Sequence, residues 1–157
     1  MCEADRCMKV RVIACGNPMM GNDGVGLAVK DALHAARPDL DVVDGGLGGL
    51  SLVTLLEDCD AVVIVDATCG MGAQGSVVVF RDIPSSTLFP LSLHDVGIAE
   101  TLEIARAVGI TTRVAIVGIE GGDITGYRTG LDPEVEASVP AACSLVLALV
   151  DEFKKCE

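Results

Sequence analysis

Residues 61–66 of the chain have the sequence Ala-Val-Val-Ile-Val-Asp, and this stretch decides the class of fold. Its apolar, largely β-branched residues are typical of a strand that is buried on both faces of a sheet. A strand of that kind needs helices on both faces, as in the parallel sheets of α/β proteins. The stretch ends on Asp66, which places a carboxylate at the end of a buried strand.

The segments around this strand alternate between strand and helix patterns. Further strands are predicted over residues 9–15, 41–43, 76–80 and 113–118. Helices are predicted over residues 25–36, 50–56 and 96–108, and from 133 to near 153. Ser92 and Asp95 form a capping-box pattern before the third helix, and Asp132-Pro133 is an N-cap followed by a first-turn proline before the last.

The order of these elements predicts one domain over residues 1–157, with residues 1–8 flexible. Strand 76–80 follows strand 61–65 without a helix between them, which predicts one antiparallel edge strand. The fold class is therefore α/β. We expect a three-layer α/β/α sandwich with a mainly parallel, twisted sheet of about five strands.

Composition excludes several classes of partner. Lys and Arg number 11 against 23 Asp and Glu, which gives a net charge of −12. A chain this acidic repels nucleic acid and anionic lipid. Its longest apolar runs fall short of the roughly 20 residues of a membrane helix, and the N-terminus shows no secretory signal. We therefore expect no nucleic-acid partner and no membrane.

Cysteine usage points to a reducing compartment. The seven cysteines are odd in number and include no CxxC pair. This disfavours zinc ribbons, iron–sulfur clusters and thioredoxin-type redox motifs. Cys15, Cys59 and Cys143 lie in apolar or helical settings and are predicted to be small buried hydrophobes. The predicted compartment is the cytoplasm.

The glycine-rich loop at residues 16–26 follows the first predicted strand. Gly16 and Gly21 have the spacing of a phosphate-binding loop, but Asn22-Asp23 stands where a Lys-Ser/Thr pair is needed. The glycines also miss the GxGxxG spacing of dinucleotide-binding proteins. What the loop does place at a helix N-terminus is a carboxylate, Asp23.

Ligands of open α/β sheets bind beyond the carboxyl ends of the strands, and three side chains of the predicted fold lie there. These are Asp23, Asp66 and His94. Each also has a purely structural interpretation: Asp23 as a helix cap, Asp66 as an Asx-turn, and His94 as a hydrogen-bonding group at a helix end. The other histidine, His34, is predicted to face solvent. Together, two carboxylates and one imidazole form a set that suits an openly held divalent ion such as nickel or zinc.

Four segments resemble the hydrogenase maturation endopeptidases, in family order and over almost the whole chain after about Lys9. These are Gly16-Asn17-x4-Asn22-Asp23-Gly24-x-Gly26, Ile64-Val65-Asp66-Ala67, Ser92-Leu93-His94-Asp95 and Gly130-Leu131-Asp132-Pro133-Glu134-Val135. One departure is Asn22, where many members of the family have Asp. Asn22 is not a ligand position, so we expect it to alter hydrogen bonding around the site rather than to remove the site.

The resemblance implies a nickel-dependent processing protease. Such an enzyme removes a C-terminal extension from the precursor of a [NiFe]-hydrogenase large subunit after nickel insertion. Carried over by position, Asp23, Asp66 and His94 are the metal ligands and the catalytic residues. The nickel is expected to come with the substrate rather than to reside in the enzyme, and zinc or cadmium could occupy the same site.

Two other functions stay open at this stage. One is a nickel-sensing chaperone or docking protein of the same fold that binds the precursor without cutting it. The other is a small-molecule-binding, flavodoxin-like domain, which the unsuitable phosphate loop disfavours. The sequence shows no arrangement of a serine or cysteine nucleophile, and it leaves the oligomeric state open.

Overall fold

The computed structural model describes residues 6–81 and 97–155, which contain a sheet of five strands in the order β2-β1-β3-β5-β4. The strands are β1 (Val10–Ala14), β2 (Val42–Asp44), β3 (Ala61–Thr68), β4 (Val77–Phe80) and β5 (Arg113–Glu120). Four strands are parallel, and β4 pairs with β5 in the antiparallel direction. This confirms the predicted sheet, including its one antiparallel edge strand.

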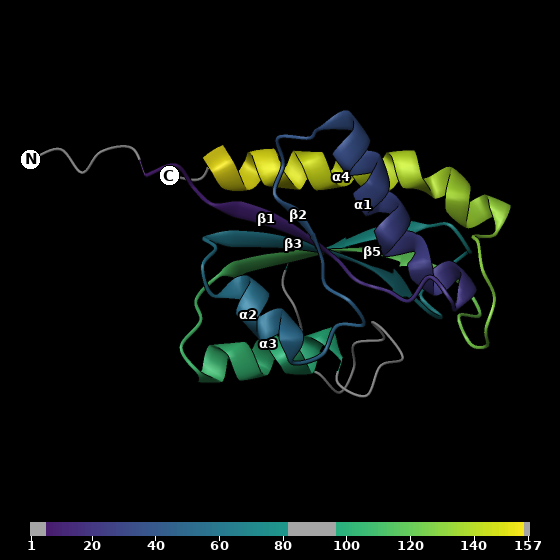
Figure 1. Ribbon diagram of the computed structural model, residues 1–157, viewed down its shortest axis with the longest axis horizontal. Coiled ribbons are helices and arrows are strands. Elements are labelled where there is room, and N and C mark those ends of the chain that lie inside the picture. Colours follow the sequence, from purple (N-terminus) through teal and green to yellow (C-terminus); the bar gives the residue numbers. More distant parts are fainter. Residues whose placement is uncertain (1–5, 82–96, 156–157) are drawn as a thin grey trace, which may run out of the picture.

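Helices cover both faces of the sheet. They are a short 3-10 helix η1 (Gly21–Gly24), then α1 (Val25–Ala36), α2 (Ser51–Leu56), α3 (Ile98–Ala107) and α4 (Pro133–Lys155). Figure 1 shows α1 and α4 on one face and α2 and α3 on the other. Each face holds its own cluster of buried aliphatic side chains. The predicted three-layer sandwich is therefore confirmed.

Strand β3 is the centre of both clusters, as residues 61–66 predict. Val63 and Val65 pack with α1 and α4, whereas Val62 and Ile64 pack with α2 and α3. The prediction that Asp66 ends the strand is wrong, because β3 runs on to Thr68 while it pairs with the end of β5. Since side chains alternate between the faces of a strand, Asp66 follows Ile64 onto the α2–α3 side.

The predicted start of the third helix and the predicted flexible N-terminus lie at the borders of the described residues. Helix α3 begins at Ile98 with Gly97 as its N-cap, two residues later than predicted, because Gly97 is extended (φ −68°, ψ 163°). Ser92 and Asp95, the predicted capping box, lie outside the described residues. The prediction of a flexible segment at residues 1–8 falls partly outside them too, since the description begins at residue 6.

Helix α4 starts as the Asp132-Pro133 pair predicts. The carbonyl oxygen of Asp132 accepts hydrogen bonds from the backbone N–H groups of Val135 (3.0 Å) and Glu136 (2.9 Å). By length and composition α4 is apolar enough to cross a membrane. In this fold Ala142 and Val146 are fully buried against the sheet beside α1, so its apolar face belongs to the core of the sandwich.

Candidate functional site

Asp66 is the most unusual polar group of the sheet. Its side chain is fully buried, and Oδ1 accepts one hydrogen bond, from the backbone N–H of Ala67 at 2.8 Å. Oδ2 is buried and has no hydrogen-bond partner among the described residues. Burial, followed by the negative charge of Asp23, raises the pKa of Asp66 from 3.8 to about 8. Asp66 therefore carries a proton at neutral pH unless a cation is present.

Asp23 lies in η1, between the loop that follows β1 and the start of α1. It is 2% exposed, and its Oδ2 accepts a hydrogen bond from the backbone N–H of Asn17 at 2.9 Å. It does not cap α1, whose N-cap is Gly24 without a side-chain bond. The charge of Asp23 raises the pKa of Asp66, so the fold places these two predicted site residues within electrostatic range of one another.

Two glycines allow the loop to fold tightly against the strands. Gly16 has φ +140°, and a Cβ there would lie 2.0 Å from the carbonyl oxygen of Asp23. A Cβ at Gly26 would lie 2.3 Å from the carbonyl oxygen of Cys15 and 2.9 Å from that of Val65. The glycines quoted from the sequence thus have a structural task, which is to let the backbone that carries Asp23 reach the ends of β1 and β3.

Asn22 bonds this loop to the segment between β5 and α4. Its side chain is fully buried, and its Nδ2 donates to the carbonyl oxygen of Gly121 (2.8 Å) and to Oδ2 of Asp132 (2.9 Å). Its Oδ1 accepts a hydrogen bond from the backbone N–H of Asp132 at 2.8 Å. The residue that departs from the common family pattern therefore makes three hydrogen bonds beside Asp23. Its sequence neighbours alone do not reveal these partners, which are about 100 positions away.

Glu120, at the end of β5, is a buried carboxylate that the sequence reasoning did not single out. It accepts hydrogen bonds from the Thr68 hydroxyl (2.8 Å) and from the backbone N–H groups of Gly70 (2.8 Å), Met71 (3.1 Å) and Gly122 (3.2 Å). Burial acts to raise the pKa of Glu120, but these bonds outweigh it and hold the pKa below its ordinary value. Glu120 ties together the loops that follow β3 and β5.

Cys15 directly follows β1 and is fully buried, as predicted. Burial, then the charges of Asp66, Asp44 and Asp23, raises the pKa of its thiol well above the ordinary value. A thiol held in its protonated form is a poor nucleophile. The second histidine, His34, is exposed as predicted, and its Nε2 lies 3.0 Å from the carbonyl oxygen of Val42.

His94, the third predicted ligand, lies outside the described residues. Within residues 6–81 and 97–155, no group of three or more His, Cys, Asp or Glu side chains is placed to hold a metal. The described part of the site therefore consists of two carboxylates. A divalent cation stabilises such a pair, because it replaces the proton of Asp66 and satisfies the unbonded oxygen of that side chain. The residues present fit such an ion.

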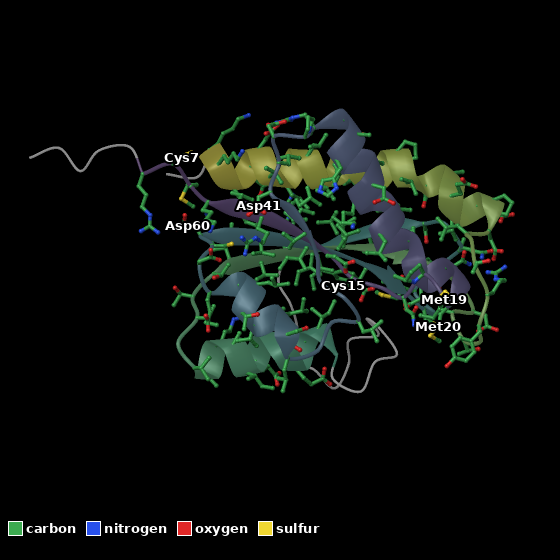
Figure 2. The ribbon with its side chains drawn as sticks, in the orientation of Figure 1. Cys7, Cys15, Met19, Met20, Asp41 and Asp60 are labelled. Carbon is green, nitrogen blue, oxygen red and sulfur yellow. The ribbon has the colours of Figure 1, made fainter. Side chains whose placement is uncertain are left out.

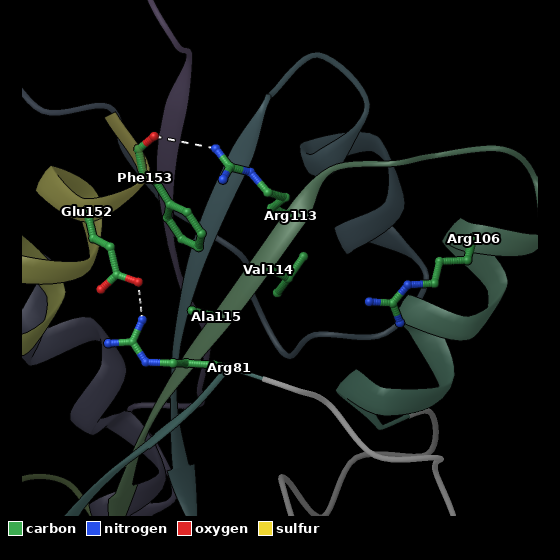
Figure 3. Close-up of a pocket in the computed structure, with 7 residues that line it drawn as sticks. All are labelled: Arg81, Arg106, Arg113, Val114, Ala115, Glu152 and Phe153. Carbon is green, nitrogen blue, oxygen red and sulfur yellow. Dashed lines mark hydrogen bonds and ion pairs between the residues drawn. The ribbon is translucent and has the colours of Figure 1, made fainter. Parts of the chain in front are cut away.

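A hollow of about 330 Å³ lies at the other end of the sheet, near the start of β5. Figure 3 shows Arg81 paired with Glu152, and Arg113 bonded to the carbonyl oxygen of Phe153 (3.4 Å). Asp66 stands near the opposite end of β3, so this hollow is separate from the two carboxylates.

Comparison with known proteins identifies the class to which this fold and site belong. The family model described as hydrogenase maturation protease (HycI) matches residues 25–149. The chain therefore belongs to the hydrogenase maturation protease family.

Individual relatives agree with this. The chain is 29% identical over 152 residues to the hydrogenase 2 maturation protease of Escherichia coli K12, covering 92% of each protein. It is also 29% identical over 154 residues to a putative hydrogenase maturation protease of Methanocaldococcus jannaschii, covering 93% of this chain and 97% of the relative. Among solved structures, the hydrogenase maturating endopeptidase HybD from E. coli superposes with a TM-score of 0.78 at 28% identity, covering 92% of this chain and 93% of HybD.

Proposed function

We propose that this protein cleaves the C-terminal extension from the precursor of a [NiFe]-hydrogenase large subunit after nickel has been inserted. Asp23, Asp66 and His94 bind the nickel that the precursor carries, and the metal at that position positions and polarises the peptide to be cut. Zinc or cadmium can occupy the same ligand set. The cytoplasm is the compartment we propose, and the free thiols of the described cysteines fit it.

One observation supports this proposal above the others. Asp66 has a buried oxygen without a hydrogen-bond partner among the described residues, and the charge of Asp23 acts on the same group. Burying a carboxyl group in this way is unfavourable for a fold that needs it only for stability. A cation brought by the substrate satisfies that oxygen and removes the repulsion between the two acids.

This arrangement links cleavage to nickel loading. Without the metal, Asp66 holds a proton, and the pair of acids offers little to bind a metal-free precursor. With the metal, both carboxylates become ligands, so the loaded precursor is bound at the site in preference to the empty one.

The test is to incubate the protein with nickel-loaded precursor and, in parallel, with the same precursor lacking nickel. We expect a shortened product, detected by mass spectrometry, only from the loaded sample. Asp23→Ala and His94→Ala are expected to give folded proteins that leave the loaded precursor intact. Equal cleavage of loaded and empty precursor, or normal processing by either variant, contradicts the proposal; an intact complex with the wild-type protein indicates a docking protein instead.

A further inference from the structure

Large apolar side chains are exposed at few positions of the described chain, and most of these lie at one edge of the sheet. The described residues of this kind are Met19, Leu47, Leu50, Ile104, Val108 and Tyr127. Ile104 and Val108 belong to the end of α3. The other four lie in loops that follow the carboxyl ends of β1, β2 and β5, and we call them the apolar rim (Met19, Leu47, Leu50 and Tyr127).

The loops that carry the apolar rim are held side by side by backbone hydrogen bonds. On one side, the N–H of Gly16 donates to the carbonyl oxygen of Gly46 at 2.9 Å. On the other, the N–H of Arg128 donates to the carbonyl oxygen of Met19 (2.8 Å), and the N–H of Gly21 donates to that of Arg128 (2.6 Å). The loop that leads to Asp23 therefore runs between the Leu47–Leu50 side and the Tyr127 side.

The rim is open to a partner. Its side chains are 51–89% exposed, and Tyr127, the single tyrosine of the chain, is the most exposed of them. Beside Tyr127 lies a hollow of about 580 Å³, lined in part by Gln74, Asp123 and Arg128. Figure 2 shows Met19 and Met20 at the end of the molecule away from Cys7 and Asp60. Exposed Tyr and Met are enriched in the parts of protein surfaces that bind other proteins.

The position of the two carboxylates limits what can occupy this surface. Asp23 is 2% exposed and Asp66 is fully buried, and both lie at the edge of the sheet that carries the rim. A metal lies about 2 Å from its carboxylate ligands. A metal held by another polypeptide therefore reaches Asp23 and Asp66 only when that polypeptide itself lies against the loops of the rim.

Charge argues against a second copy of this chain as the occupant. Each copy has a net charge of −12, so two copies repel one another. Apolar contacts with a different protein avoid this repulsion. They also strengthen binding without adding competing groups beside the carboxylates.

We propose that the apolar rim is the docking surface for the large-subunit precursor and receives apolar side chains that flank its metal site. The inference rests on the proposed function, since it takes the precursor as the substrate. It adds that binding energy comes from Met19, Leu47, Leu50 and Tyr127 as well as from the metal. These four residues accordingly lower KM, whereas the carboxylates are also needed for cleavage itself.

The experiment compares the wild-type protein with the double variants Leu47→Ser/Leu50→Ser and Met19→Ser/Tyr127→Ser on nickel-loaded precursor. Val108→Ser is the matched control, because Val108 is 66% exposed but lies at the end of α3. We expect each double variant to raise KM about tenfold, with kcat within about twofold of wild type. The control is expected to keep both constants. Wild-type KM in both double variants, or an equal rise in the Val108 control, overturns the proposal.

Two further outcomes separate this inference from the proposed function. If the wild-type protein binds the precursor without cutting it, the proposed function fails, and a Kd about tenfold weaker in the double variants still supports the rim as the docking surface. If the wild-type protein sediments as a dimer that Leu47→Ser/Leu50→Ser converts to monomers, the rim joins two copies of this chain and the inference is wrong. Absence of any binding between precursor and wild-type protein overturns both proposals.

Discussion

Asp66 and Glu120 are buried carboxylates on neighbouring parallel strands, and their surroundings are opposite. Glu120 accepts hydrogen bonds from one hydroxyl and three backbone N–H groups, and its pKa lies below the ordinary value. Asp66 accepts one bond, leaves Oδ2 without a partner among the described residues, and has a pKa of about 8. Burial alone therefore does not decide whether the fold itself satisfies a carboxylate.

The difference lies in the supply of donors. Glu120 accepts hydrogen bonds from backbone N–H groups of the turn after β3 and of the loop after β5. Without Glu120 these N–H groups would lack partners. Asp66 instead has the negative charge of Asp23 acting on it, and this charge increases the need of Asp66 for a proton or a cation. The first carboxylate stabilises the fold, and the second is suited to a cation from outside.

The largest effect is expected from Asp66→Asn. The amide has the same shape but is a poor ligand, so processing of nickel-loaded precursor should fall at least about 100-fold, the upper range for losing a group that only supports a ligand. The free energy of unfolding should not decrease at neutral pH, because the variant removes a poorly solvated carboxyl group. Mass spectrometry of the product and urea unfolding measure the two. Retained processing contradicts a ligand role for Asp66.

The pH dependence of stability tests the raised pKa directly. Asp66 loses its proton near 3.8 in the unfolded chain and at about 8 in the folded protein, so between these values the folded state holds the extra proton. The contribution of Asp66 to stability is therefore greatest at low pH and declines as pH rises through this window, by about 1.4 kcal/mol per pH unit. The difference between wild-type and Asp66→Asn unfolding curves should show this slope. A difference that stays constant from pH 4 to pH 8 shows that the pKa is not raised.

Glu120→Gln should behave in the opposite way to Asp66→Asn. The amide nitrogen of the new glutamine would face N–H donors, and the charge-assisted hydrogen bonds of the carboxylate would be lost. The free energy of unfolding should therefore fall by about 2–4 kcal/mol. Cleavage per folded molecule should stay within about twofold of wild type under conditions where the variant is fully folded. An activity loss as large as that of Asp66→Asn assigns Glu120 to the site and removes the contrast between the two carboxylates.

Asn22→Asp is expected to lower both stability and cleavage, each to a moderate extent. The new carboxylate faces the carbonyl oxygen of Gly121 and Oδ2 of Asp132, so two donated hydrogen bonds become contacts between acceptors. Unfolding should become easier by about 1–3 kcal/mol, and cleavage about tenfold slower because the loop of Asp23 loosens.

Gln74→Ala is the matched control for Asn22→Asp. It removes another hydrogen bond to Oδ2 of Asp132 (2.6 Å) and leaves Asn22 in place. We expect the control to lower stability without slowing cleavage. Equal slowing by both variants means that Asp132, rather than Asn22, controls the loop.

The sequence predicted the class of fold because its strands and helices have strong local patterns. The valine-rich run of residues 61–65 and the Asp132-Pro133 start of α4 are examples. It also predicted that Asp23 and Asp66 lie at the same edge of the sheet, since loops after parallel strands gather there. It failed on the length of β3, because residues 66–68 continue the strand only through pairing with β5. The place of His94 stays a prediction, since this residue lies outside the described ones.

By itself, then, the sequence determined which segments become strands and helices and that Asp23 and Asp66 lie at one edge of the sheet, because these properties depend on neighbours a few positions away. Only the tertiary structure decided that Glu120 is saturated with donors while Asp66 is not, and that Asn22 bonds to Asp132. Those differences depend on groups 50 to 110 positions apart along the chain, which are brought together by packing rather than by local pattern.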